Sequence, residues 1–416
     1  MKTQHFGMTI GLYINYFLLG MINIIFTSNM SFLTTQLNTD NTGISFLVSG
    51  IGIGKLITLS VSGRLSDKFG RKPLVLTASF LYLIFLIGIP LAPTYKIAFI
   101  IAIIAGVSNS ILDSGSYPAL IEAFPKNTGI STVLIKAFIS IGAMILPIII
   151  SYIMNHNIFY GYSFFILAFI FFINGSFLSI VRFPKNSNYS DEDTIYEALR
   201  FKTKPIIWLE GLATIFMGFT TTTLFMVVQV WLPTYGLNIL GMSKTDSIQL
   251  LSFFNIGSLI SVLILAIVIN RFISPIVILI LYPFLTSLSL LILLFCHQPI
   301  LLIISSFLIG FSTAGLFQLC ITVIVEFFPK NKATKSAYVS TASSTAFIVI
   351  PYITGLIAKN IGVTAVFWLD ITIAIVSIIL ATFVFYRHKK VFKKNRSFIQ
   401  SNESFLIEYK DTNYLD

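Results

Sequence analysis

The feature of this sequence that most constrains its fold is the absence of charge from long stretches. Lys, Arg, Asp and Glu are missing from blocks such as 3–39, 73–95, 137–181, 211–243 and 272–325. A bilayer core about 30 Å thick is crossed by about 20 apolar residues in a helix, so these blocks predict membrane-spanning helices. The runs are continuously apolar, which favours helices over a β-barrel. Because only 10% of the residues are charged, an ordinary soluble domain is excluded.

The blocks predict twelve spans. Two of the longest blocks are interrupted by polar residues at 155–157 and 297–299, so each holds two helices and a short turn. The first span is too long for a signal peptide, and we expect no cleaved leader. Cys296 and Cys320 fall within or at the end of spans, so no disulfide is expected. The predicted spans are 7–34, 43–62, 73–92, 97–121, 132–154, 159–182, 206–235, 245–268, 275–295, 300–325, 336–358 and 363–386.

Successive loops lie on alternate sides of the membrane, and the basic residues lie mostly in the loops of one side. Of the 27 Lys and Arg residues, Lys96, Lys244 and Lys359 fall in one set of loops, two fall within spans, and the remaining 22 fall in the other set and in the chain ends. Cytoplasmic loops are rich in Lys and Arg, so we expect a multi-pass protein of the cytoplasmic (inner) membrane with both termini in the cytoplasm. The net charge of +11 predicts contact with the lipid bilayer and no nucleic acid partner.

An internal repeat divides the chain. Residues 106–147 align with 310–351 without gaps at a constant offset of 204, which pairs Glu122 with Glu326. Such duplication is how some transporters build a central site between two halves. We therefore expect an all-α polytopic protein of two pseudo-symmetric six-helix bundles. The predicted domains are 1–182 (first bundle), 183–205 (cytoplasmic linker), 206–386 (second bundle) and 387–416 (cytoplasmic tail).

The loop after the second span reads Gly63-Arg64-Leu65-Ser66-Asp67-Lys68-Phe69-Gly70-Arg71-Lys72. Two glycines permit a tight turn, and the basic residues suit the headgroup level; by composition alone this is a basic turn between helices. The loop resembles the signature G-x-L-[A/S]-D-[R/K]-x-G-R-[R/K] of the major facilitator superfamily at every specified position. The resemblance implies that superfamily's fold and a conformational latch on the cytoplasmic side, formed by Gly63, Asp67, Gly70, Arg71 and Lys72.

Further segments resemble one group within that superfamily, the YdiM/YdiN group of inner-membrane transporters. The group's association with quinate and shikimate metabolism points to hydroxylated carboxylates as cargo. Many superfamily members have an arginine in span four where this chain has Ala102, and 141–147 lacks the Gly-Pro-rich signature of drug/proton antiporters. Both departures weaken a drug-efflux assignment. The resembling segments are 11–16, 109–125, 134–138 and 241–243.

Three charged residues are predicted inside the spans of the first bundle: Lys55, Asp113 and Lys136. At 1.5 Å per residue, Asp113 lies about 13 Å and Lys55 about 12 Å from the cytoplasmic ends of their helices. A charge at that depth needs a partner or a water-filled cavity. Either Asp113 forms a buried pair with Lys55 or Lys136 that fixes helix packing, or it exchanges a proton and couples transport to a proton gradient. Asp370, in span twelve, is expected to be structural.

Uncharged polar side chains also recur within the spans. The family resemblance places spans one, four, seven and ten around a substrate cavity, while packing between helices is the alternative, since Ser, Thr and Asn often serve it in membranes. Glu122 and Glu326, near cytoplasmic helix ends, are expected to act as a cytoplasmic gate. The candidate cavity residues are Asn23, Thr27, Asn109, Tyr117, Gln229, Asn255 and Gln318.

These features predict a secondary transporter that moves a small neutral or anionic organic solute by proton-coupled alternating access. Two lysines against one aspartate favour an anionic or neutral cargo. Multidrug efflux by proton antiport is one alternative, and a non-transporting sensor or channel is another. The four histidines lie in tails or loops, without metal-ligand spacing, and no nucleophile motif or phosphate-binding loop occurs. We therefore expect no enzyme, no catalytic residue, no cofactor and no metal, and we expect a monomer whose partners are a small-molecule substrate, protons and lipid.

Overall fold

The computed structural model describes residues 6–124, 128–184, 203–269, 273–296, 298–328 and 332–392. Within these ranges the chain is helical, and an isolated bridge of strand type joins Ile269 and Ile273. The helices are α1 (Phe6–Ser28), α2 (Met30–Gln36), α3 (Asn41–Phe69), α4 (Arg71–Gly88), α5 (Tyr95–Ala123), α6 (Thr128–Asn155), α7 (Tyr162–Ile180), a π-helical turn η3 (Ile207–Gly211), α8 (Leu212–Asn238), α9 (Lys244–Val268), α10 (Pro275–Phe295), α11 (Pro299–Thr313), α12 (Leu316–Phe327), α13 (Lys332–Asn360) and α14 (Val363–Val391).

The described residues contain twelve segments long and apolar enough to cross a membrane, which confirms the predicted polytopic fold. Two predicted spans are not single helices. The first is divided at Asn29, whose side-chain amide donates to the Ile25 carbonyl and to the Ser163 hydroxyl. The tenth is divided at Gly315, whose φ of +78° lies in the left-handed region that glycine adopts readily. The sequence pattern did not predict either break, because no charged residue or proline interrupts the two spans there.

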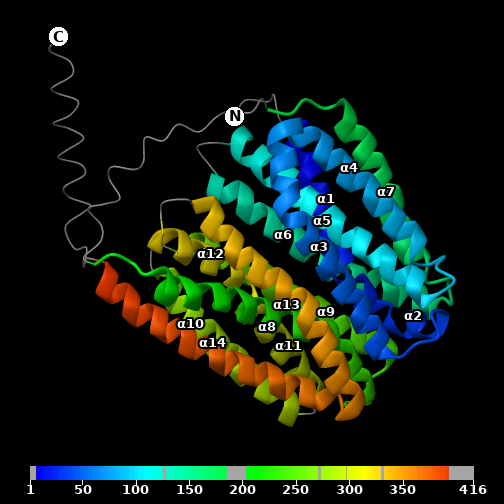
Figure 1. Cartoon of the computed structure of the whole chain (residues 1–416). Coiled ribbons are helices and arrows are strands. Elements are labelled where there is room, and N and C mark those ends of the chain that lie inside the picture. The colour runs from blue at the N-terminus through cyan, green and yellow to red at the C-terminus, as the bar shows by residue number, and fades with distance from the viewer. Residues whose placement is uncertain are drawn as a thin grey trace.

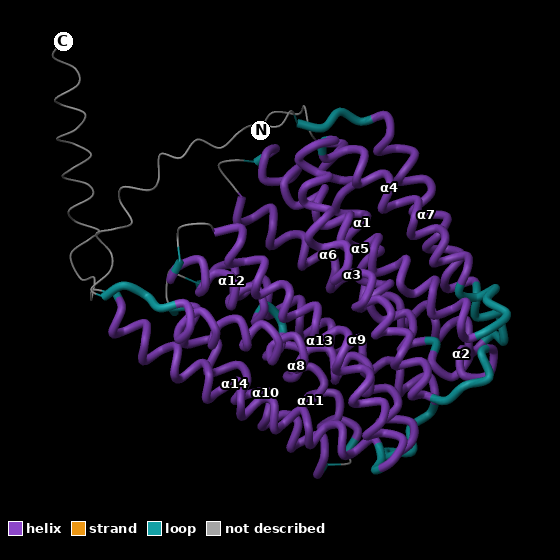
Figure 2. The backbone as a smooth tube through the Cα atoms, in the orientation of Figure 1, coloured by secondary structure: helices purple, strands orange, loops and turns teal. Residues whose placement is uncertain are grey.

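Two bodies lie side by side in Figure 1, the first formed by α1 to α7 and the second by α8 to α14. The tube in Figure 2 shows helices joined by short loops at the two ends of these bodies. Each body holds six spans, an even number, so the chain enters and leaves it on one side of the membrane. We call the side where α1 begins and α14 ends the terminal face, and the opposite side the far face.

The expected domain boundaries lie at the edge of what the structure describes. Residues 185–202, which make up most of the predicted linker 183–205, lie outside the described residues, and so does most of the predicted tail, 393–416. The division into 1–182 and 206–386 therefore stays a prediction, although the last helix of the first body ends at Ile180 and the next begins at Ile207.

Helices within each body approach until their backbones touch. A Cβ atom on Gly106 of α5 would overlap the carbonyl oxygen of Ile51 on α3. In the second body, a Cβ on Gly310 of α11 would overlap the carbonyl oxygen of Phe254 on α9. The repeat pairs Gly310 with Gly106, so the duplication is present in the packing as well as in the sequence. Such small residues let membrane helices gain van der Waals contact where no hydrophobic effect drives them together.

The two bodies contact each other at the far face and along the adjoining part of their helices. The Lys359 ammonium lies 3.4 Å from Asp40 at the far face. The polar contact closest to the terminal face joins the hydroxyls of Ser140 and Ser258, about 22 Å along α6 from its far-face end. In the described residues no hydrogen bond or ion pair joins the bodies beyond it, so this structure is closed at the far face. The polar contacts between the bodies are Asp40–Lys359, Thr42–Gly355, Ser45–Pro351, Met30–Thr234, Asn155–Thr245, Met144–Ser252, Ala143–Asn255 and Ser140–Ser258.

Because backbone atoms of α3 surround Gly106, Gly106→Val should force α3 and α5 apart. We expect a loss of about 1–3 kcal/mol or more, seen as a lower melting temperature of the purified protein in detergent. Gly63→Ala is the matched control, since nothing lies within 4 Å of a Cβ at that position of α3. Equal melting temperatures for the two variants would contradict the close approach of the helices.

Candidate functional site

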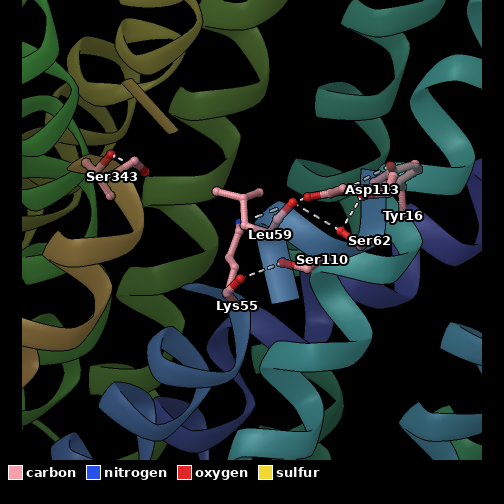
Figure 3. Close-up of polar contacts among 9 residues, drawn as sticks. Tyr16, Lys55, Leu59, Ser62, Ser110, Asp113 and Ser343 are labelled. Atoms are coloured by element: carbon pink, nitrogen blue, oxygen red, sulfur yellow. Dashed lines mark hydrogen bonds and ion pairs between the residues drawn. The ribbon is translucent and has the colours of Figure 1, made fainter. Parts of the chain in front are cut away.

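A charged cluster lies inside the first body. Asp113, on α5, has one carboxylate oxygen 4.0 Å from the Lys55 ammonium on α3, and the other accepts a hydrogen bond of 3.1 Å from the Tyr16 hydroxyl on α1 (Figure 3). The Lys55 and Asp113 side chains are 26% and 32% exposed. An ion pair at this separation and exposure is weak, so either side chain can change partner at little cost. The structure thus brings together two residues that the sequence placed at similar depth.

The cluster lies at the boundary between the bodies. Lys136, on α6, is partly exposed and close enough to Asp113 and Lys55 to interact with both charges. The Lys55 ammonium lies 5.5 Å from the ring centre of Phe347, on α13 of the second body. In Figure 3, Ser343 of α13 lies across from Lys55. With all three groups ionised, the cluster carries a net charge of +1.

Aromatic packing orients the tyrosine that reaches Asp113. Tyr16 is fully buried, and Tyr117, one turn beyond Asp113 on α5, packs edge-on against its ring with centroids 5.8 Å apart. Buried rings have little rotational freedom, so the Tyr16 hydroxyl is held toward the carboxylate. Tyr117, predicted as a cavity residue, is partly exposed and adjoins the cluster.

A row of serine hydroxyls runs from the cluster toward the terminal face along the contact of α3 and α5. Ser110 donates to the carbonyl of Lys55 at 2.8 Å. Ser62 and Ser114 share a hydrogen bond of 2.7 Å, and Ser66 donates to the carbonyl of Ser114 at 2.7 Å. Small side chains fit here because the glycine contacts leave little space between the helices, and their hydroxyls satisfy one another inside the bundle.

The row ends at the predicted latch. Arg71 donates to the Ser66 hydroxyl at 2.8 Å and, through Nε and Nη2, to one oxygen of Glu122 at 3.2 and 3.1 Å. Lys72 donates to the carbonyl of Val181 at 2.9 Å, just beyond the end of α7. The structure therefore joins Arg71 to Glu122, which the sequence analysis had placed in two separate sets, a latch and a gate.

The glycines of the latch differ in role. Gly70 has a φ of +88° and forms the whole turn between α3 and α4. Gly63 lies inside α3, which continues to Phe69, so its predicted part in a tight turn is wrong. The span prediction ended at residue 62, because the following residues are charged, yet the helix extends two turns beyond the apolar segment. The side chain of Asp67 lies outside the described part of the structure.

The predicted cavity residues differ in exposure. Asn23 is exposed although it lies in the middle of α1, and an amide within a span is favourable only where water or another polar group reaches it. Gln318, on α12, is partly exposed, while Asn109 and Gln229 are buried. Asn23, Lys55 and Asp113 are thus at least partly exposed although they lie inside the spans.

One of the buried candidates contacts the other body. Asn255 of α9 donates to the Leu251 carbonyl at 2.7 Å and to the Ala143 carbonyl of α6 at 3.4 Å. This contact favours helix packing over cargo binding for Asn255. Thr27 lines a small pocket together with Thr234 of α8, near the far face, and its part in cargo binding stays a prediction.

The terminal face of the second body carries ion pairs that the sequence analysis did not predict. Glu210, in η3, is fully buried, and it accepts a hydrogen bond of 2.7 Å from Nε of Arg387 and one of 2.8 Å from the Ile206 amide. Glu326, the predicted partner of Glu122 in a gate, instead lies 3.1 Å from Nε2 of His388. The sequence signal was present, because Arg387 and His388 follow the last span at the level of these two glutamates.

The described residues hold no group of three or more His, Cys, Asp or Glu side chains that could bind a metal ion. Asp370, on α14, is fully buried, and neither carboxylate oxygen has a hydrogen-bond partner among the described residues. It does not belong to the cluster around Asp113, and its structural role stays a prediction.

A family model and several known proteins match this chain over most of its length. The family model described as Major Facilitator Superfamily matches residues 12–301 and 250–412. The chain is 47% identical over 391 residues to YfkL of Bacillus subtilis (strain 168), described as an uncharacterized MFS-type transporter, covering 94% of this chain and 99% of that one. It is 38% identical to the inner membrane transport protein YdiN of Escherichia coli (strain K12), covering 92% of this chain and 90% of that one, and 36% identical to YdiM of the same strain, covering 94% and 96%.

A solved structure has the same fold. The crystal structure of a D-xylose-proton symporter superposes with a TM-score of 0.74 over 92% of this chain and 98% of that one, at 16% sequence identity. The match of the family model and these relatives confirms the resemblance seen in the loop 63–72. The chain belongs to the major facilitator superfamily and is a multi-pass membrane transport protein rather than an enzyme.

Proposed function

We propose that this transporter moves a small organic anion, such as a hydroxylated carboxylate, together with a proton across the cytoplasmic membrane. The observation that carries the proposal is the cluster of Lys55, Asp113 and Lys136 at the boundary between the bodies. Its net charge of +1 favours an anion. Ionisable groups inside a membrane are costly and usually serve transport, so the cluster is the strongest candidate for the cargo and proton site.

Protonation of Asp113 would favour binding of the anion. It raises the net charge of the cluster from +1 to +2 and releases Lys55 from its ion pair. At an effective dielectric of about 20, two charges 4–8 Å apart interact by roughly 2–4 kcal/mol. Because coupling between two sites is reciprocal, a bound anion favours protonation to the same extent. Proton and anion would then be carried together, which agrees in kind with the proton symporter of the same fold.

The contacts between the bodies support alternating access. They begin at the far face and end near Ser140 and Ser258, so opening the far face requires only that these contacts part. The excess of Lys and Arg in its loops supports a cytoplasmic location for the terminal face. The structure would then represent the inward-facing conformation, with Lys55 and Asp113 reached from the cytoplasm, and the outward-facing conformation would bring them to the other side.

A thermal-shift screen tests the cargo assignment. We expect carboxylates, hydroxylated ones above all, to raise the melting temperature of the purified transporter, because the net positive charge of the cluster attracts them. Stabilisation by neutral sugars or cationic drugs alone would overturn the assignment of an anion.

A pair of lysine variants provides the control for that screen. Lys136→Gln should weaken binding of the stabilising anion at least about tenfold, the equivalent of about 1.4 kcal/mol. Lys96→Gln removes an exposed charge near the far face and should leave the affinity unchanged. Equal affinities in the two variants would place the cargo site elsewhere.

Asp113→Asn tests the coupling. The amide cannot exchange a proton, so accumulation driven by a proton gradient should be lost, while exchange of labelled for unlabelled cargo across the membrane should continue. Asp370→Asn changes another carboxylate within a span and should keep accumulation. If Asp113→Asn still accumulates cargo in proteoliposomes, Asp113 is a structural ion and the proton is carried by another group.

The orientation can be tested by labelling single cysteines in a background that lacks Cys296 and Cys320. With the far face outside, an impermeant maleimide added to intact cells should modify cysteines at Asn157 and Lys244 and spare one at Lys68. Labelling at Lys68 from outside would reverse the orientation.

A further inference from the structure

The fourth and tenth spans end at the terminal face in equivalent glutamates with different partners. The offset of 204 pairs Glu122 at the end of α5 with Glu326 at the end of α12. Glu122 is bound by Arg71, and the two side chains are only 7% and 11% exposed. A guanidinium keeps its charge at every pH that a cell meets, so the charge of Arg71 does not change with pH.

Among the described residues, no arginine pairs with Glu326 as Arg71 pairs with Glu122. The partner of Glu326 comes instead from the end of α14, where Nε2 of His388 lies 3.1 Å from its carboxylate. Both side chains are more exposed than in the first body, at 25% for His388 and 34% for Glu326. Water and protons from the terminal face therefore reach this pair.

The imidazole is held in place by aromatic rings. Phe392 stacks on His388 with centroids 4.3 Å apart, and Phe327, next to Glu326, packs edge-on at 5.6 Å. The ring orientation is thus fixed by packing, and the contact with Glu326 does not depend on the charge of His388 to form. The strength of the contact does depend on it, because a charge-assisted hydrogen bond is roughly twice as strong as a neutral one.

Several other charged groups at this end contact partners of their own. Arg387 is bound to the buried Glu210 of η3. Lys389 lies over Phe385, 4.3 Å from its ring centre, and Lys335 of α13 lies 5.7 Å from that of Phe328. Lys390 is exposed, Lys332 begins α13, and α10 carries no charged residue between Pro275 and Phe295. Among the described residues, Glu326 is therefore the carboxylate that responds to the charge of His388.

We propose that His388 and Glu326 form a second proton-binding site, separate from Asp113, that sets how readily the terminal face closes. Imidazole gains and loses its proton between pH 5 and 8. With His388 charged, Glu326 is held within its own body and the conformation seen here is favoured. When His388 loses the proton, Glu326 is free to meet exposed cations of the first body, such as Arg64 and Lys68 at the end of α3, as the terminal face closes. A proton that binds one conformation better shifts the population toward it.

The test measures the conformational equilibrium directly and needs no cargo. Spin labels on Lys96→Cys and Ile361→Cys, exposed far-face positions in the two bodies, report whether the far face is open in lipid nanodiscs. Cys296 is replaced by serine, and Asp113→Asn is present throughout so that Asp113 does not titrate. From pH 5.5 to 8.5 we expect the ratio of far-face-open to far-face-closed molecules to rise roughly three- to tenfold.

Three variants decide the assignment. His388→Arg fixes the positive charge and should stay in the closed population at every pH, while Glu326→Gln removes the partner and should be open-biased without a pH response. His156→Gln, at an exposed histidine of the far face, should respond as its parent does. A parent without a pH response, or a response that persists in His388→Arg, would overturn the proposal. The result is independent of the proposed anion symport, which is tested by accumulation in the Asp113 variant.

Discussion

The close approach of α3 and α5 is the contact on which the candidate site depends. Gly54 and Gly106 bring the two backbones together, so that only hydroxyl-sized side chains fit between the helices toward the terminal face. The serines that fit there form hydrogen bonds to one another and to backbone carbonyls. Lys55 and Asp113 lie at the inner end of this row and Arg71 at its outer end. A change of helix spacing at the glycines would therefore disturb both the cluster and the latch.

The charges of Lys55 and Asp113 determine what the first body can bind. A lysine and an aspartate inside the hydrocarbon region are tolerated where water reaches them, and both side chains are about one-third or one-quarter exposed. Their loose contact of 4.0 Å differs from the tight, nearly buried pair of Arg71 and Glu122 at the terminal face. The loose pair can be opened by a proton or an anion at small cost, whereas the tight pair holds its helices together throughout.

The sequence predicted the fold well because twelve apolar blocks leave few alternatives in a membrane. It predicted poorly which side chains of a span point toward the cavity, because a span that is apolar on every side has no polar face from which its orientation can be inferred. Asn255 was therefore predicted to line a cavity, although its side-chain amide donates to the Ala143 carbonyl of the other body. The break at the left-handed Gly315 was missed because neither a charged residue nor a proline marks it in the sequence. The pairs of Arg387 and His388 were missed because helix α14 continues past its apolar segment.

The two bodies are alike in packing but not in charge. The offset of 204 places Phe317 opposite Asp113 and Ser340 opposite Lys136, so the second body has no counterpart of the charged cluster. Duplication thus preserved the glycine contacts, which both bodies need in order to pack, and freed the polar positions to diverge. If cargo and proton bind on the first body, the second acts mainly as the surface that closes over them. A proton site at His388 would then regulate that closing movement from the terminal face, without a direct contact to the cargo.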